Sequence, residues 1–214
     1  MLYYLSVFQS IIVYVTMSLD YVIVLFTVVA LIMATVTKKL YRDRNLVRIK
    51  STINSKFYIV RQSKNSEEAA NMLARLEQKI NEINTILQRD EARKKYPQHR
   101  EHIEQMNAAL PHMELKESDP NTKHTSYTIN KGETMIVCLR SKVDGRIHDE
   151  NLVLYVVLHE LAHVACPEWG HTPLFTQIFR MITEVATEHG VYKRIDFENH
   201  PAVYCGMNIT HAII

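Results

Sequence analysis

Ten consecutive residues in the second half of the chain read Val156-Val157-Leu158-His159-Glu160-Leu161-Ala162-His163-Val164-Ala165. They place the pattern H-E-x-x-H inside an otherwise apolar segment. If this segment is helical, His159 and His163 lie one turn apart on the same face, so both imidazoles can bind one metal ion. Glu160 lies on the neighbouring flank, within reach of a water molecule that the metal holds. The pattern predicts a zinc site with Glu160 as general base.

The alternative interpretation is a core helix that contains two hydrogen-bonded histidines. The flanking residues are apolar, so the helix is expected to be buried, and buried polar groups without partners are costly. A shared metal ion would provide that partner. We predict that this helix runs from about Glu150 to Ala165, with Asp149 as its N-cap.

The segment after the motif reads Cys166-Pro167-Glu168-Trp169-Gly170-His171-Thr172-Pro173. Pro167 and Gly170 predict the end of the first helix and a turn. Thr172 and Pro173 form a typical N-cap and first-turn pair for a second helix, which we expect to reach about Glu188.

His171 comes just before the second helix, and we predict that it is the third ligand. Its spacing, H-E-x-x-H-x7-H, differs from that of metzincins, whose third histidine comes two residues earlier. The alternative role for His171 is a capping residue. In that case an acidic residue such as Glu168 or Glu184 would complete the site.

The rest of the second half indicates an α+β fold. Two strand-like runs, His124–Ile129 and Met135–Leu139, are separated by a turn with Gly132, which is typical of a hairpin. We expect a small antiparallel sheet packed on a few helices. One of these strands is a candidate for holding a substrate as an added strand, and the alternative is a purely structural sheet.

An amphipathic helix is predicted to start at Ser66, with a second helix around Ile103, Met106 and Leu110. The first carries an apolar stripe that is spaced alternately by four and three residues: Ala69, Leu73, Leu76, Ile80, Ile83 and Leu87. This stripe predicts a helix that packs on the domain, and the alternative is a short coiled coil. The cluster Glu117–Asn121 is predicted to be a loop.

The N-terminal segment is strongly apolar. Residues Tyr21–Thr37 contain no charge, and we predict a transmembrane anchor within residues 1–37, either as a single span at about 21–37 or as a hairpin that turns near Asp20. A cleaved signal peptide fits less well. Residues 38–64 are predicted to be a basic juxtamembrane linker, which places the rest of the chain in the cytosol. A further role for the linker is attraction to anionic lipid or to DNA.

Overall charge and cysteine content give weaker signals. The 214-residue chain has a formal net charge of +2, which makes no general case for nucleic-acid binding. Its three cysteines contain no C-x-x-C pair, so we predict free thiols in a reducing compartment. Tyr204 or Tyr192 is a candidate to stabilise an oxyanion, and the alternative is that both are core or rim aromatics.

A family resemblance rests on several of these motifs. They are Ser126–Gly132, Cys138-Leu139-Arg140, His159–His163, Gly170-His171 with Phe175, and Pro201 with Tyr204-Cys205-Gly206. Together they resemble the WLM metallopeptidases, above all the WLM-like proteins of large DNA viruses, within a wider SprT-like group. The resemblance implies a zincin-like metallopeptidase domain at residues 65–210. It also implies that His159, His163 and His171 bind zinc and that Glu160 is the catalytic base.

In cellular members of this group the resemblance also implies the degradation of proteins crosslinked to DNA. This chain has no extended tail after the domain and adds an apolar N-terminal segment, so viral or membrane-proximal proteins are equally good substrate candidates. We therefore predict a membrane-anchored zinc endopeptidase that acts on proteins, with DNA or DNA-bound proteins as candidate partners. The alternative is a non-catalytic zinc-binding scaffold tethered to a membrane. The oligomeric state does not follow from the sequence.

Overall fold

The computed structural model describes residues 21–37, 45–122 and 124–214, and the chain divides into two units, residues 1–44 and 45–214. The strands of the second unit are β1 (Leu46–Lys50), β2 (Phe57–Arg61), β3 (Glu114–Glu117), β4 (Tyr127–Ile129), β5 (Thr134–Val137), β6 (Ala202–Tyr204) and β7 (Met207–Ile209). Its helices are α2 (Ser66–Leu87), α3 (Asp90–Lys95), α4 (Arg100–Ala109), α5 (Glu150–Ala165) and α6 (Pro173–Glu188), with 3-10 turns η1 (Pro97–His99) and η2 (Leu110–His112). The predicted α+β class is confirmed.

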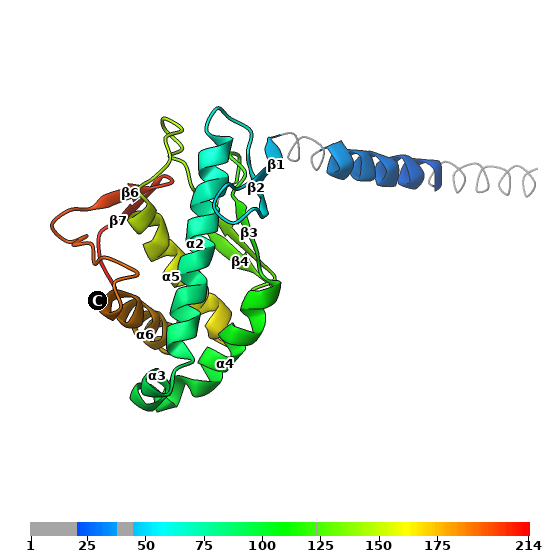
Figure 1. Cartoon of the computed structure of the whole chain (residues 1–214). Coiled ribbons are helices and arrows are strands. Elements are labelled where there is room, and N and C mark those ends of the chain that lie inside the picture. Colours follow the sequence, from blue (N-terminus) through cyan, green and yellow to red (C-terminus); the bar gives the residue numbers. More distant parts are fainter. Residues whose placement is uncertain (1–20, 38–44, 123) are drawn as a thin grey trace, which may run out of the picture. The chain divides into compact units, whose positions relative to one another are not determined.

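The main sheet has five strands in the order β1-β2-β3-β5-β4 (Figure 1). The hairpins β1–β2 and β4–β5 are antiparallel, whereas β3 pairs in parallel with both β2 and β5. The prediction of an antiparallel sheet is therefore wrong for its centre. The predicted β4–β5 hairpin is confirmed, and β4 lies at the end of the sheet. β3 was missed because Glu117, its last residue, begins a polar cluster that resembles a loop.

The sheet begins earlier in the chain than the sequence suggested. Residues 38–64 were predicted to be a linker, but residues 46–61 form the β1–β2 hairpin of the domain. Tyr58 and Val60 are buried, while Arg48 and Lys50 on β1 are two of the basic residues that suggested a linker. The compact unit therefore starts at residue 45 rather than 65. Residues 38–44 lie outside the described part of the chain.

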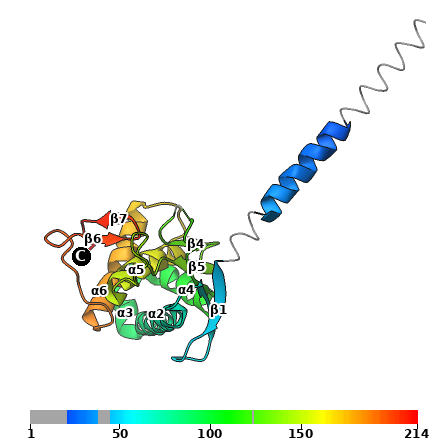
Figure 2. The ribbon, with the colours of Figure 1, turned by 90° about the horizontal axis from the view of Figure 1, so that it is seen from above.

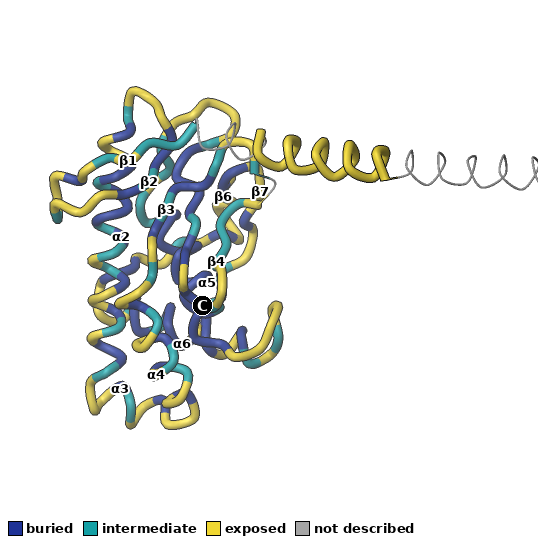
Figure 3. The backbone as a smooth tube through the Cα atoms, turned by 90° about the vertical axis from the view of Figure 1, so that its right-hand side faces the viewer, coloured by how far each residue is buried: buried dark blue, intermediate teal, exposed yellow. Residues whose placement is uncertain are grey.

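The helices cover the sheet and one another. α2 packs against β1, β2 and β3, α5 packs against β4 and β5, and both α4 and α6 pack against α5. Figure 2 looks along α2 and shows β6 and β7 on the opposite side of the domain from β1. Figure 3 shows that the buried parts of the backbone concentrate in these packed helices and in the sheet. Apart from its first turn and the motif residues His159, Glu160 and His163, α5 is apolar, as suits a helix that is surrounded in this way.

The apolar stripe of α2 faces the domain, as predicted. All six of its residues, from Ala69 to Leu87, are buried. The coiled-coil alternative is not needed to explain the stripe, because the domain itself covers it. The helix also begins at Ser66 as predicted, with Glu67 and Glu68 in its first turn, where their charges suit the helix dipole.

A buried ionic cluster joins three parts of the sheet. The carboxylate of Glu117 at the end of β3 pairs with the guanidinium of Arg140, and it accepts a 2.7 Å hydrogen bond from the backbone N–H of Arg61. The Arg61 side chain in turn donates to the carbonyl of Ser118 at 2.7 Å. A buried carboxylate is tolerated only when it is paired in this way. The cluster therefore explains how a chain segment with loop-like composition forms the central strand.

The cysteine prediction is wrong for two of the three residues. Cys138, just after β5, and Cys205, between β6 and β7, form a disulfide, whereas Cys166 is free and buried. The disulfide ties the β6–β7 hairpin to the end of the main sheet. Sequence spacing gave no sign of it because the two cysteines are 67 residues apart.

The N-terminal unit contains one described element. Residues 21–37 form an α-helix in which every residue is exposed. Within the part of the chain that the structure describes, no helix combines the length and the apolar character that crossing a membrane requires. Residues 1–20, the rest of the predicted anchor, lie outside the described residues.

Candidate metal centre and cleft

The central helix α5 supplies two histidines and one glutamate to the candidate site. Its start is fixed by Asp149, whose carboxylate accepts hydrogen bonds from the backbone N–H groups of Asn151 and Leu152, as predicted. The helix ends at Ala165. His159 and His163 lie on its partly exposed face, whereas Glu160 is buried. The helical placement of the motif is therefore confirmed.

The third histidine comes from the loop between α5 and α6. After the extended residue Cys166, Gly170 turns the chain with a φ of 81°, a conformation that favours glycine. Thr172 then caps α6, and its hydroxyl accepts a hydrogen bond from the backbone N–H of Phe175. His171 immediately precedes this cap, so the position of its backbone is tied to the start of α6.

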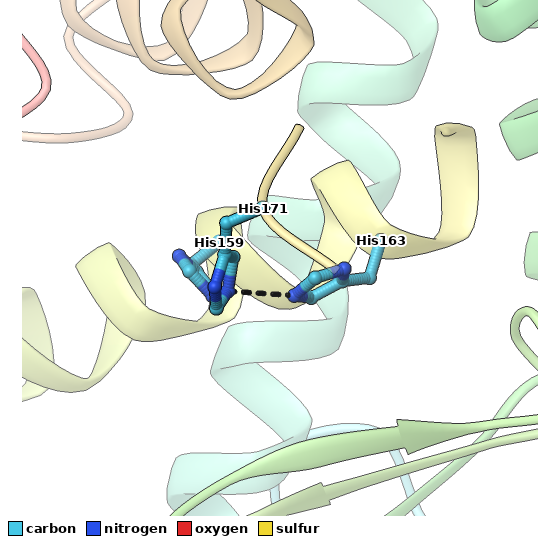
Figure 4. A group of neighbouring side chains, drawn as sticks. All are labelled: His159, His163 and His171. Atoms are coloured by element: carbon cyan, nitrogen blue, oxygen red, sulfur yellow. Dashed lines mark hydrogen bonds between the residues drawn. The ribbon is translucent and has the colours of Figure 1, made fainter. Parts of the chain in front are cut away.

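The three imidazoles converge through their Nε2 atoms. The Nε2 atom of His171 lies 3.0 Å from that of His159 and 3.2 Å from that of His163. Figure 4 shows the two side chains from α5 and the loop side chain turned toward one another. Among the described residues, these three histidines form a group of possible metal ligands. Their ligand atoms all lie within 4.8 Å of one another. Glu168 and Glu184, the replacement ligands considered above, do not belong to this group.

A phenylalanine of α6 packs against all three histidines of this group. Phe175 is buried, and its ring stacks on that of His163 with centroids 4.2 Å apart. The rings of His159 and His171 each lie edge-on to it, with centroids at 4.9 Å. One aromatic ring therefore contacts all three imidazoles and limits how they can rotate. In the sequence, Phe175 stood out only as part of the family resemblance, without a role at the site.

The electrostatics of the site favour the neutral form of the two imidazoles on α5. The pKa of His159 is lowered to about 3 and that of His163 to about 4, mainly by burial and in part by the neighbouring histidines. Neutral imidazole is the form that binds metal ions. The fold thus maintains the binding-competent form at neutral pH.

These residues fit a zinc ion. Zinc binds imidazole nitrogen at about 2.0–2.1 Å, which places two such nitrogens roughly 3.3 Å apart in a tetrahedral arrangement. The separations of 3.0 and 3.2 Å between the Nε2 atoms are close to that value. Three protein ligands also leave a fourth position open, as is usual for catalytic rather than structural zinc.

Glu160 lies beside the histidines and has a polar partner on the sheet. The hydroxyl of Thr128, on β4, donates a 3.1 Å hydrogen bond to its Oε2 atom. Burial raises the pKa of Glu160 to about 7, and the bond from Thr128 opposes that rise. A carboxylate with a pKa near neutrality is suited to accept a proton and release it again. Thr128 was not singled out from the sequence, because no local spacing relates it to Glu160.

A cleft of about 630 Å³ opens over these groups. β4 contributes Tyr127 and Thr128, and Lys131 follows in the turn after it. α5 contributes Tyr155, Val156 and the motif residues, and the ligand loop contributes residues 168–171. The C-terminal segment of residues 207–211 also lines the cleft. That last contribution was not predicted, and it depends on the disulfide that holds the β6–β7 hairpin.

Neither tyrosine proposed for the oxyanion lines this cleft. Tyr204 is fully buried, and its hydroxyl shares a 2.7 Å hydrogen bond with the hydroxyl of Ser126. The Tyr192 hydroxyl is used inside the domain, where it accepts from the backbone N–H of Ile195 at 3.3 Å. The structure therefore favours the alternative interpretation, in which both are core aromatics.

Comparison with known proteins finds that the chain is similar to several viral proteins. No family model matches it. A protein named 136R of Invertebrate iridescent virus 6 is 41% identical over 69 residues, which cover 31% of this chain and 38% of that protein. Protein 042R of Invertebrate iridescent virus 3 is 42% identical over 67 residues, which cover 31% and 42%.

A solved structure and a further viral protein match over longer regions. The crystal structure of Wss1 from Saccharomyces cerevisiae is similar over 61% of this chain and 89% of that chain, with a TM-score of 0.41 and 18% identity. Protein R325 of Acanthamoeba polyphaga mimivirus is 42% identical over 166 residues, which cover 78% of this chain and 83% of that protein. This chain belongs to the same protein family as R325.

Proposed function

We propose that this protein is a zinc-dependent endopeptidase of the WLM type. The observation that carries the proposal is the convergence of three imidazole Nε2 atoms beside a buried carboxylate in an open cleft. His159, His163 and His171 would hold the ion, and Glu160 would act as the general base. A purely structural zinc site is usually closed by a fourth protein ligand and has no use for an adjacent base.

The proposed mechanism assigns a task to each residue of the chain. Bound zinc would lower the pKa of a water molecule and polarise the scissile carbonyl. The carboxylate of Glu160 would accept a proton from the attacking water and pass it to the leaving amine. The Thr128 hydroxyl holds the carboxylate by its Oε2 atom, and the Phe175 ring keeps the three imidazoles in place.

β4 is proposed to hold the substrate. It pairs with β5 at the end of the sheet, and two of its residues line the cleft. An extended peptide can add to such an edge as a further strand, with backbone hydrogen bonds that are independent of sequence. This arrangement suits a protein substrate in an extended or unfolded segment.

The test compares the full chain with two matched variants. Glu160→Gln removes the base and keeps a hydrogen-bond acceptor for Thr128, whereas Glu184→Gln removes a carboxylate on α6 that contacts Tyr96. We expect all three proteins to bind one zinc per chain, and we expect Glu160→Gln alone to lose cleavage of an unfolded protein on a gel. Stoichiometric zinc without cleavage by the wild type would favour the non-catalytic scaffold.

The substrate class is examined by the same experiment. Each reaction is run on a basic DNA-binding protein with and without single-stranded DNA. Cleavage that requires DNA would support a role on DNA-bound proteins, the function that the family resemblance implies. Cleavage that is independent of DNA would support a role on viral or membrane-proximal proteins.

We further propose that the apolar N-terminal segment, residues 1–37, holds the protein at a membrane. What supports this is the composition of the segment and the exposure of apolar side chains all around the helix at 21–37. The full chain is expected to float with lipid vesicles, whereas a Leu25→Arg, Leu31→Arg variant is expected to remain in the soluble fraction. Equal flotation of both proteins would contradict this proposal.

A further inference from the structure

The turn between β4 and β5 contains a lysine in an unusual backbone conformation. Asn130 and Lys131 have φ angles of 48° and 54°. This left-handed region costs a residue with a side chain about 1 kcal/mol or more, and glycine adopts it freely. A lysine at this position is therefore not explained by the shape of the turn, and strained residues of this kind often belong to functional sites.

Gly132, the next residue, allows this turn to lie in close contact with α5, the helix that carries His159 and His163. A Cβ atom on Gly132 would lie 2.9 Å from a methyl carbon of Val164 and 3.0 Å from the Cβ of Ala109. Only a residue without a side chain permits such a close approach. The close contact brings the Lys131 side chain to the C-terminal end of α5, where the chain begins the loop that carries His171.

The ammonium group of Lys131 contacts three residues of that loop. It donates hydrogen bonds to the carbonyl oxygens of Cys166 at 2.7 Å and Glu168 at 2.6 Å. It also lies over the exposed ring of Trp169, 4.6 Å from the centroid. A cation is favoured at the C-terminus of a helix, where carbonyl groups lack partners within the helix. The carbonyl groups of the first half of the loop are therefore held by the side chain of Lys131 from the β4–β5 turn.

The second half of the loop has few contacts of its own apart from that of His171 with the ring of Phe175. A Cβ atom placed on Gly170 would meet no other described atom within 4 Å, and His171 is exposed. The Thr172 cap fixes only the far end, at the start of α6. The direction in which the loop presents His171 thus depends on the anchor at Cys166 and Glu168 together with the cap at Thr172 and the ring of Phe175.

We propose that Lys131 is a positioning residue for the third metal ligand. Its contacts hold residues 166–169 so that the imidazole of His171 meets those of His159 and His163 before a metal binds. This inference rests on the proposed zinc site. A lysine that acted only as a helix cap would affect stability without a selective effect on zinc binding.

The test uses the full chain and four variants. Lys131→Met keeps the length and apolar stem of the side chain and removes the charge, and Lys131→Arg restores a cation. Asn130→Gly is the matched control, because it changes the neighbouring left-handed residue, whose side chain bonds to Glu133 rather than to the loop. Lys131→Gln replaces Lys131→Met if the latter does not fold. Zinc affinity is measured by competition with a chromophoric chelator.

We expect Lys131→Met to weaken zinc binding by about 10–100-fold, the usual effect of losing a residue that supports a ligand. Lys131→Arg should recover most of that loss, and Asn130→Gly should bind zinc as the wild type does. An unchanged zinc affinity in a folded Lys131→Met protein would overturn the proposal.

A second measurement does not depend on zinc. In metal-free protein, we expect the backbone amides of residues 166 and 168–171 to exchange with deuterium faster in Lys131→Met than in the wild type or in Asn130→Gly. Equal exchange in all three proteins would overturn the anchoring role of Lys131. If the wild type bound no zinc while this difference in exchange persisted, the proposed function would fail but the anchoring of the loop would stand.

Discussion

The hydroxyl of Thr128 donates a 3.1 Å hydrogen bond to the carboxylate of Glu160, and thereby links the edge strand of the sheet to the candidate general base. The two residues are 32 positions apart in the chain. A bond to the ionised form of a carboxylate lowers its pKa and fixes its direction.

Replacing Thr128 with valine is expected to impair catalysis without abolishing zinc binding. The pKa of Glu160 would rise because the ionised carboxylate loses its donor, so the acidic limb of the profile of kcat/KM against pH would move to higher pH. At neutral pH the rate would fall by about tenfold, the effect of one hydrogen bond to a charged group. Thr128→Ser keeps a hydroxyl and should retain the wild-type profile. Identical profiles for Thr128→Val and the wild type would argue against a role for this bond.

The buried carboxylate of Glu160 should destabilise the metal-free protein at neutral pH. Its pKa is raised from 4.5 to about 7, so the unfolded chain ionises before the folded one does as the pH rises. Stability is therefore lost between about pH 4.5 and 7, by on the order of 3 kcal/mol at the upper end. Glu160→Gln lacks this penalty. Urea unfolding should show the variant to be more stable above pH 7, with the difference vanishing below pH 4.5. A difference that does not depend on pH would contradict the raised pKa.

Phe175 is expected to be important both for stability and for metal binding. Phe175→Ala removes a buried ring and should cost about 3–5 kcal/mol of folding free energy. It should also weaken zinc binding by about 10–100-fold, because the ring contacts all three imidazoles. Phe175→Leu keeps much of the volume and serves as the control. Thermal unfolding measures the loss of stability, and chelator competition measures the zinc affinity. An unchanged zinc affinity in Phe175→Ala would show that the imidazoles do not depend on contact with this ring.

Two glycines with positive φ, Gly132 and Gly145, can be compared to test the close approach of the β4–β5 turn to α5. Gly132→Ala would place a Cβ 2.9 Å from the rigid side chain of Val164, so we expect a loss of about 2 kcal/mol or more. Gly145, with a φ of 70°, has no described atom within 4 Å of the corresponding position. Gly145→Ala should therefore cost only about 1 kcal/mol of backbone strain. Similar unfolding free energies for the two variants would contradict the tight contact.

The disulfide should be directly measurable. Thiol titration of the unfolded chain is expected to find one free cysteine, Cys166, without reductant and all three with it. Replacing both Cys138 and Cys205 with serine should lower the free energy of unfolding by about 2–5 kcal/mol. Three free thiols in the unreduced protein, purified under non-reducing conditions, would show that the bond does not form.

The parts of the site that the sequence could predict are those fixed by local signals. The H-E-x-x-H spacing on an apolar helix, the Asp149 cap and the Thr172-Pro173 helix start depend on residues within a few positions of one another. They located α5, α6 and the histidine that precedes α6. The stripe of α2 was equally local, since its period alone shows which face is buried.

The parts that the sequence could not predict depend on contacts between distant segments. The parallel pairing of β3 with β2 and β5 involves strands that are not adjacent in the chain. Glu117 is charged and was therefore expected in a loop, but it is buried because Arg61 and Arg140, from other segments, pair with it. The same holds for the donor at Thr128 and for the disulfide. In each case the residue types were visible in the sequence, but their proximity is set by the tertiary fold.

The Cys138–Cys205 disulfide has a consequence for how the protein would respond to being cut. It closes residues 138–205 into a covalent ring, and this ring contains Glu160, the three histidines and the whole of α5 and α6. A single peptide-bond break anywhere inside the ring, including one made by the enzyme itself, opens it but releases no fragment. A nicked molecule would migrate as one chain until the disulfide is reduced, so self-cleavage within the site would be visible only on a reducing gel.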